Sequence, residues 1–249
     1  MMLLVSGATK TMARLAHEPR LGRLLTPNNR NSIASAFAGG GVVAADNAAF
    51  SGFDHAAFLH FAGRLRGLPV EWIAVPDIVG NSLGTLYLFL HYWHLLQDGD
   101  GMVPLAFVAQ DGMEDEDCDE ALGLAECLFI GGSTEWKLSR AAEDLARAAK
   151  ARGLLVHMGR VNSRKRIQHA LEIGCDSFDG SGWSRFPDTR IPLALRWLRD
   201  LEAQPALFSN GDQAWHDSPS QSAAASESIP SPCSSGFTSE RILRSPGHD

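Results

Sequence analysis

Short apolar runs that end in polar or glycine-rich residues recur along this chain. They span 42–47 (VVAADN), 72–77 (WIAVPD), 105–112 (LAFVAQDG), 127–132 (CLFIGG), 154–160 (LLVHMGR) and 175–180 (CDSFDG). Continuous apolar runs of about four to eight residues are typical of parallel strands that are buried on both faces. The pattern therefore predicts buried parallel strands whose C-terminal ends carry polar side chains.

Segments with helical periodicity follow these runs. One of them, 139–153, starts at Ser139 as the predicted N-cap and ends at Gly153. Two weaker runs near the start, 3–7 and 24–27, bring the predicted strands to eight, each followed by a helix. Eight such units predict a compact (β/α)8 TIM-type barrel. A doubly wound open sheet is the alternative, although neither GxGxxG nor GxxxxGK[ST] occurs in the chain.

Composition divides the chain into two parts. Residues 209–249 are rich in Ser, Pro and Ala and poor in large apolar side chains, so we expect a disordered tail after a barrel domain at 1–208. No apolar run reaches the roughly 18 residues of a membrane span, and the N-terminus has no basic segment typical of a signal peptide. The four cysteines show no CxxC spacing, which argues against a zinc knuckle or a disulfide framework. We therefore expect a cytoplasmic protein with reduced thiols and no membrane contact.

Polar residues at the strand ends are the candidates for chemistry. Asp46, Asp77, Gln110 and Asp179 each follow an apolar run, and in a barrel these ends meet on one rim. Each one alone could be only a turn or a helix cap. Their shared position at strand ends favours an active site, because barrel enzymes assemble their catalytic groups from the ends of several strands.

The order of these strand ends resembles the tRNA-guanine transglycosylase superfamily, which exchanges guanine for a 7-deazaguanine. AADNAAFSGF is similar to the family's DSGGFQ-type motif, FVAQDG to its GIVQGG-type strand, and FIGG to its IGG turn. VHMGRVNS is similar to an LMGVG-type strand, and EIGCDSFDGSGWSR resembles the segment with the aspartate nucleophile. The resemblance covers 42–185. The family's CxCxxC zinc site and its C-terminal region are missing, which favours DNA over tRNA as the substrate.

The resemblance implies roles for residues of this sequence. Asp179 would be the nucleophile that forms a covalent aspartyl–glycosyl intermediate, and Asp46 the general acid/base. The implied substrate-binding residues are Asp77, Gln110, Gly131, Gly132, Met158 and Phe50. A cluster of cations could contact phosphates, namely Arg160, Arg164, Lys165 and Arg185, with Lys137 on the same predicted rim.

The implied activity is a pentosyltransferase that needs no cofactor and no metal. Its partners would be a nucleic acid, a free 7-deazaguanine base and, in a homodimer, a second copy of the chain. Two alternatives remain open at this stage. One is a non-catalytic barrel that binds nucleobases or nucleic acid, and the other is a metal-dependent hydrolase with Asp46, Asp77 and His157 as ligands, which the lack of an HxH pair disfavours.

Overall fold

The strands form a closed parallel barrel. The computed structural model describes residues 1–28, 33–49, 52–97, 102–114 and 116–203. The barrel strands follow one another in chain order: β1 (Met2–Val5), β2 (Leu21–Leu25), β3 (Val43–Ala45), β4 (Ile73–Ala74), β5 (Leu105–Ala109), β6 (Cys127–Ile130), β7 (Leu155–Met158) and β8 (Ser177–Phe178). The last strand pairs with the first, with Leu3 opposite Phe178. The predicted (β/α)8 barrel is therefore confirmed, and the open-sheet alternative is wrong because the sheet has no free edge strand.

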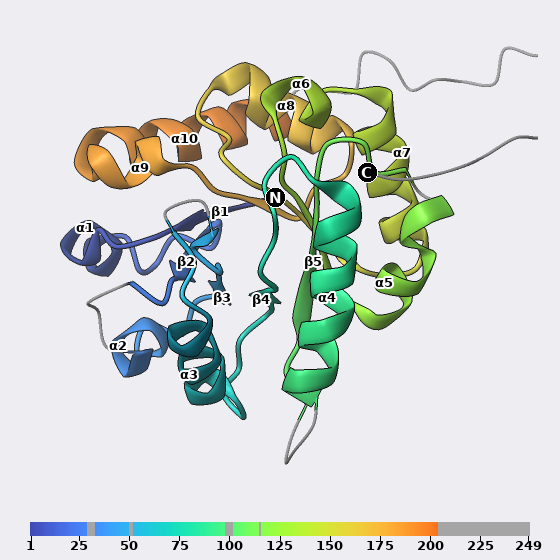
Figure 1. Ribbon diagram of the computed structural model, residues 1–249. Helices are drawn as coiled ribbons and strands as arrows, with labels where there is room; N and C mark the ends of the chain where they lie inside the picture. Colours follow the sequence, from blue (N-terminus) through green and yellow to red (C-terminus); the bar gives the residue numbers. More distant parts are fainter. Residues whose placement is uncertain (29–32, 50–51, 98–101, 115, 204–249) are drawn as a thin grey trace, which may run out of the picture. The chain divides into compact units, whose positions relative to one another are not determined.

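Helices surround the strands on the outside (Figure 1). They are α1 (Thr9–Arg14), α2 (Ile33–Phe37), α3 (His55–Leu65), α4 (Ser82–Gln97), α5 (Asp119–Leu124), α6 (Thr134–Lys137), α7 (Arg140–Ala151), α8 (Arg164–Glu172), α9 (Ser181–Arg185) and α10 (Pro187–Glu202), with a 3-10 helix at Glu116–Cys118 before α5. The sequence pattern did not predict the short helices α6 and α9. Both follow directly after strands β6 and β8, where they contribute to the rim.

Side-chain hydroxyls and carboxylates fix where several helices begin. The Ser139 hydroxyl accepts a hydrogen bond from the Ala142 amide at the start of α7, as the sequence predicts. The Asp54 carboxylate accepts a hydrogen bond from the Ala57 amide in α3, and the Ser163 hydroxyl accepts one from the Arg166 amide in α8. Such caps satisfy amides that have no partner within the helix, which sets the position of the helix relative to the preceding strand end.

Two apolar clusters stabilise the barrel. One fills the interior of the barrel and includes Trp72, Val108 and Phe129. The other lies between the barrel and its helices and includes Phe107 and Met158. Alternate strand residues enter the two clusters, since successive side chains of a strand point to opposite faces. Each fully buried Leu, Ile or Phe contributes about 1.5–3 kcal/mol relative to exposure, so this double burial explains the uninterrupted apolar runs.

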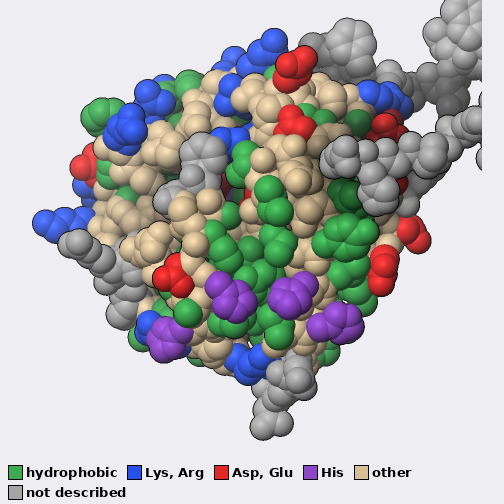
Figure 2. Space-filling model, viewed as in Figure 1, with side chains coloured by type: hydrophobic (Ala, Val, Ile, Leu, Met, Phe, Trp, Pro, Cys, Tyr) green, Lys and Arg blue, Asp and Glu red, His purple; other side chains and the backbone are tan. Residues whose placement is uncertain are grey.

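One outer face is unusually apolar. Helix α4 exposes Leu83, Tyr87 and Leu95, and Figure 2 shows apolar side chains gathered over this helix, with histidines beside them. Within the part of the chain that the structure describes, none of the helices is both long and apolar enough to cross a membrane. The predicted tail at 209–249 lies outside the described residues.

Candidate active site

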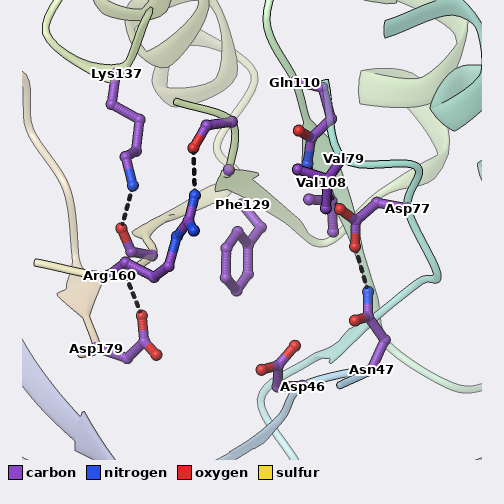
Figure 3. Close-up of a pocket in the computed structure, with 13 residues that line it drawn as sticks. Asp46, Asn47, Asp77, Val79, Val108, Gln110, Phe129, Lys137, Arg160 and Asp179 are labelled. Carbon is purple, nitrogen blue, oxygen red and sulfur yellow. Dashed lines mark hydrogen bonds between the residues drawn. The ribbon is translucent and has the colours of Figure 1, made fainter. Parts of the chain in front are cut away.

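A pocket opens at the C-terminal ends of the strands, on the rim that the sequence predicts. Its cavity volume is about 90 Å³. Residues from β3 to β8 and from the loops after them line it: Asp46, Asn47, Asp77, Val79, Val108, Gln110, Phe129, Gly131, Gly132, Lys137, Gly159, Arg160 and Asp179. In Figure 3 Lys137 and Arg160 lie on one side of the pocket, Gln110 and Asp77 lie on the other, and Phe129 lies between them.

Two side-chain amides hold the Asp77 carboxylate in place. Gln110 Nε2 donates to Asp77 Oδ2 at 2.7 Å, and Asn47 Nδ2 donates to Asp77 Oδ1 at 2.9 Å. Gln110 is fixed in turn, because its Oε1 accepts the Gly80 amide at 3.0 Å. Burial raises the pKa of Asp77, and the hydrogen bond from Asn47 opposes that rise. The result is a rigid wall that presents carboxylate oxygens as hydrogen-bond acceptors.

Asp46 is an acid tuned to neutral pH. It follows β3 and has only part of its surface exposed. Burial raises the pKa of Asp46 to about 7, and the negative charge of Asp179 adds to this rise. When two carboxylates lie close together, the negative charge of one opposes ionisation of the other. One of the two acids then keeps its proton up to about neutral pH. Asp46 can therefore donate or accept a proton near physiological pH.

Asp179 and Arg160 form the opposite part of the rim. The Arg160 amide donates to Asp179 Oδ1 at 2.7 Å, and Arg160 Nη2 donates to the Gly132 carbonyl oxygen at 2.7 Å. Arg160 adopts a left-handed backbone with φ 57°, which is uncommon for a residue other than glycine. The guanidinium thus links the loop after β6 to the loop after β7 and places positive charge beside the pocket.

Lys137 is a buried cation. Only 3% of its surface is exposed, and Nζ donates to the Gly159 carbonyl oxygen at 2.9 Å. Among the ion pairs of the described residues, none involves Lys137 within 4.0 Å. Burial lowers the pKa of Lys137 to about 8, and the positive charge of Arg160 adds to this effect. A substantial fraction of this amine is therefore unprotonated, and hence nucleophilic, at mildly alkaline pH.

Glycines allow the loops to pack tightly beneath the pocket. A Cβ at Gly131 would lie 2.8 Å from Gln110 Nε2, and a Cβ at Gly159 would lie 2.6 Å from the Phe129 ring. Gly132 has a φ of 69°, which favours glycine at this turn. These positions need glycine because neighbouring protein atoms occupy the space where a side chain would be.

The structure brings most of the predicted site residues together. Those in the pocket are Asp46, Asp77, Gln110, Gly131, Gly132, Arg160 and Asp179. The structure places Met158 in the cluster between barrel and helices, away from the pocket lining. The cations Arg164, Lys165 and Arg185 are exposed and outside the pocket lining, and Phe50 lies outside the described residues. The roles assigned to all these residues stay predictions.

Some pocket residues were not singled out from the sequence. Phe129 contributes the aromatic surface, and Asn47 orients Asp77. Phe129 lies two residues after Cys127, at the same strand face, so its inward position follows from strand alternation once that face is known. Lys137 was predicted only as a rim cation, because nothing in the local sequence indicates its burial.

A metal centre finds no support. In the described part of the chain, no three His, Cys, Asp or Glu side chains are grouped so that they could hold a metal ion. His157, a ligand in the metal-dependent alternative, is instead fully buried beside Trp72 and Phe129.

Of the comparisons with known proteins, only the one with solved structures finds similar chains, and it shows the fold alone. No family model matches the chain, and no curated protein matches it. Among solved structures, a mandelate oxidase variant with 4-Br-2-hydroxy-methylphenylacetate has a TM-score of 0.55 at 14% identity, covering 81% of this chain and 73% of that one. A mandelate oxidase mutant with the C4a-OH-FMN adduct gives 0.54 at 15% identity, with the same coverage. A native KDPGal structure gives 0.51 at 10% identity, covering 82% of this chain and 96% of that one.

These findings overturn the resemblance drawn from the strand-end motifs. The similar solved structures belong to other barrel families, and none of the three comparisons supports the tRNA-guanine transglycosylase superfamily. The predicted guanine exchange and the pentosyltransferase activity are therefore wrong, and the metal-dependent hydrolase is not supported. Short tips such as FIGG and FVAQDG misled because parallel barrels commonly have glycines and polar residues where their strands end. The nucleic acid, the 7-deazaguanine base and the second copy of the chain stay predictions.

Proposed function

We propose that this pocket performs amine-assisted carbonyl chemistry of the aldolase type on a small oxo acid. The observation that carries the proposal is Lys137, a buried amine with its pKa lowered to about 8, which lines the same pocket as Asp46. Buried lysines near a second cation are the amines that form Schiff bases with carbonyl substrates.

The reaction would start at the Lys137 amine. The unprotonated Nζ attacks the substrate carbonyl carbon, and the oxygen leaves as water after it takes up protons, which gives an iminium ion. The bond between the carbon next to the iminium carbon and the hydroxyl-bearing carbon beyond it then breaks. Its electron pair moves toward the iminium nitrogen and forms an enamine, and the hydroxyl-bearing carbon leaves as a carbonyl compound. Asp46, whose pKa is about 7, accepts the proton of the substrate hydroxyl in this step when it is in its ionised form. Protonation of the enamine carbon and hydrolysis by water release the product and restore Lys137.

The walls of the pocket suggest how the substrate would be oriented. The positive charge of Arg160 attracts the carboxylate of an oxo acid. On the other side, Asp77 is an acceptor held by Asn47 and Gln110, so it suits a hydroxyl of the substrate. Phe129 provides an apolar surface between these two polar walls. A small oxo acid with hydroxyl groups matches this distribution of charge.

A flavin, which one of the mandelate oxidase structures contains as an FMN adduct, does not fit these residues. Barrels often bind a phosphate with the loops after β7 and β8. Here a Cβ at Gly180 would lie 2.4 Å from Asn162 Oδ1, and one at Gly182 would lie 2.7 Å from the same atom. The space beside both glycines is therefore filled by Asn162, and Asp179 adds negative charge nearby. These two glycines therefore do not form an open cradle for the phosphate of a flavin nucleotide.

Reductive trapping tests the proposal. The full chain is incubated with pyruvate and sodium cyanoborohydride at pH 8, and the adduct is located by peptide mass spectrometry. We expect one reduced adduct on Lys137, which Lys137→Met abolishes and which the matched rim variant Lys165→Met retains. Formation should increase with pH around a midpoint near 8. Labelling of Lys137 that is no greater than that of Lys165 would refute amine catalysis.

A further inference from the structure

A histidine lies inside the barrel next to the pocket. His157 occupies β7 and has none of its surface exposed. Its ring packs against Trp72 at 4.8 Å and against Phe129 at 4.6 Å between ring centroids. Phe129 also lines the pocket. The imidazole is therefore held by aromatic side chains directly beneath the candidate active site.

The two nitrogens of this ring have different surroundings. Nδ1 lies 2.8 Å from Ser177 Oγ. Nε2 has no hydrogen-bond partner among the described residues and points toward Asp179 Oδ1, which is 3.6 Å away. Buried polar atoms are nearly always hydrogen-bonded, so a bare Nε2 needs an explanation. If the Ser177 hydroxyl donates to Nδ1, the ring hydrogen resides on Nε2 and faces the Asp179 carboxylate. The opposite tautomer would place a nitrogen lone pair against a carboxylate oxygen, which is unfavourable.

We propose that His157 is a positioning residue that keeps Asp179 ionised, so that the proton shared by the two pocket acids resides on Asp46. A donor that faces a carboxylate favours its charged form. At 3.6 Å the contact is longer than a hydrogen bond, and the N–H dipole acts on the Asp179 carboxylate through its electrostatic attraction. The inference rests on the acid–base role proposed for Asp46.

The other groups that face Asp179 agree with this division. The Arg160 amide already donates to the same Oδ1, and the charges of Lys137 and Asp179 attract each other. Asp46 accepts hydrogen bonds from the Ala48 amide, at 3.4 Å, and from the Asn47 amide, but its burial opposes ionisation. Two chemically identical acids thus differ in their surroundings, because the charge of Lys137 attracts Asp179 whereas burial raises the pKa of Asp46. In the substrate-free pocket this asymmetry decides which acid carries the proton.

The experiment is a carboxyl titration of the full chain without substrate. Aspartate labelled with ¹³C at Cγ is followed by NMR from pH 4 to pH 9, and Asp46→Asn and Asp179→Asn assign the two signals. In His157→Phe we expect the Asp179 midpoint to rise and the Asp46 midpoint to fall, each by about half a pH unit or more. His157→Gln, which can place an amide donor near the Nε2 position, should restore most of both midpoints.

Ser177→Ala keeps the buried ring and is the second variant, in case the larger phenylalanine prevents folding. It removes the group that fixes the tautomer, so we expect shifts in the same directions and of smaller size. Midpoints of Asp46 and Asp179 that stay unchanged in both His157→Phe and Ser177→Ala would show that His157 only fills space. Because no substrate is present, this result is separable from the trapping at Lys137. If the midpoints of Asp46 and Asp179 shift as expected but no pyruvate adduct forms on Lys137, only the amine chemistry is overturned.

Discussion

Replacing Asp46 by asparagine should stabilise the protein, and increasingly so as the pH rises. The change removes the charge but keeps the size of the side chain and an oxygen that can accept the Ala48 amide. The pKa of this carboxyl rises from 3.8 to about 7 on folding, chiefly because it is buried. A raised acid pKa means that the folded state binds more protons than the unfolded state between about pH 4 and pH 7. Stability is therefore highest below this window and is lost as the pH rises through it.

The magnitude follows from the size of the shift. About three pH units at 1.36 kcal/mol each correspond to about 4 kcal/mol of destabilisation above pH 7. Of this amount, about 2–3 kcal/mol develops between pH 5 and pH 8. Water penetration and coupling to Asp179 reduce the effect, so we expect Asp46→Asn to gain about 1–3 kcal/mol more at pH 8 than at pH 5. For a domain of this size, each 1 kcal/mol raises Tm by about 2–4 °C.

Urea unfolding at pH 5 and pH 8, followed by circular dichroism, measures this difference directly. Asp200→Asn, on the exposed side of α10, is the matched control, and we expect it to change stability by less than about 0.5 kcal/mol at both pH values. If Asp46→Asn gains no more stability at pH 8 than at pH 5, Asp46 is not a buried acid with a raised pKa. The proposed proton carrier would then be lost as well.

Two further predictions concern packing. Gly131→Ala places a methyl group 2.8 Å from Gln110 Nε2 and 2.9 Å from a backbone oxygen, so we expect a loss of about 1–3 kcal/mol in urea unfolding. Gly123→Ala, in α5 with open space around it, should be neutral or stabilising by up to about 1 kcal/mol. Equal losses of stability in Gly131→Ala and Gly123→Ala would contradict the tight packing around Gly131. Leu145→Ala in α7 removes a fully buried side chain and should cost about 2–5 kcal/mol. The exposed Leu95→Ala should cost less than about 1 kcal/mol, and Tm values that rank the two in reverse would refute the packing of α7.

Much of the fold is encoded locally. Strands buried on both faces leave uninterrupted apolar runs, which is why β3 to β8 were all predicted from the sequence. Ser139 and Gly153 likewise mark the two ends of α7 because caps depend only on neighbouring backbone groups. The gathering of Asp46, Asp77 and Asp179 on one rim also followed from sequence, since each acid comes directly after a strand. What the sequence misassigned was the chemistry, because short polar tips recur in unrelated barrels.

The pairing of β8 with β1, which closes the barrel, joins residues that are far apart in the chain, so no local pattern contains it. The same holds for the burial of Lys137 and for the approach of His157 to Asp179, which depend on side chains from separate strands and loops. Sequence alone thus determined which acids and amines the rim could offer. Tertiary structure decided which of them are reactive, because the pKa of a side chain depends on its burial and on the charges that folding brings near it.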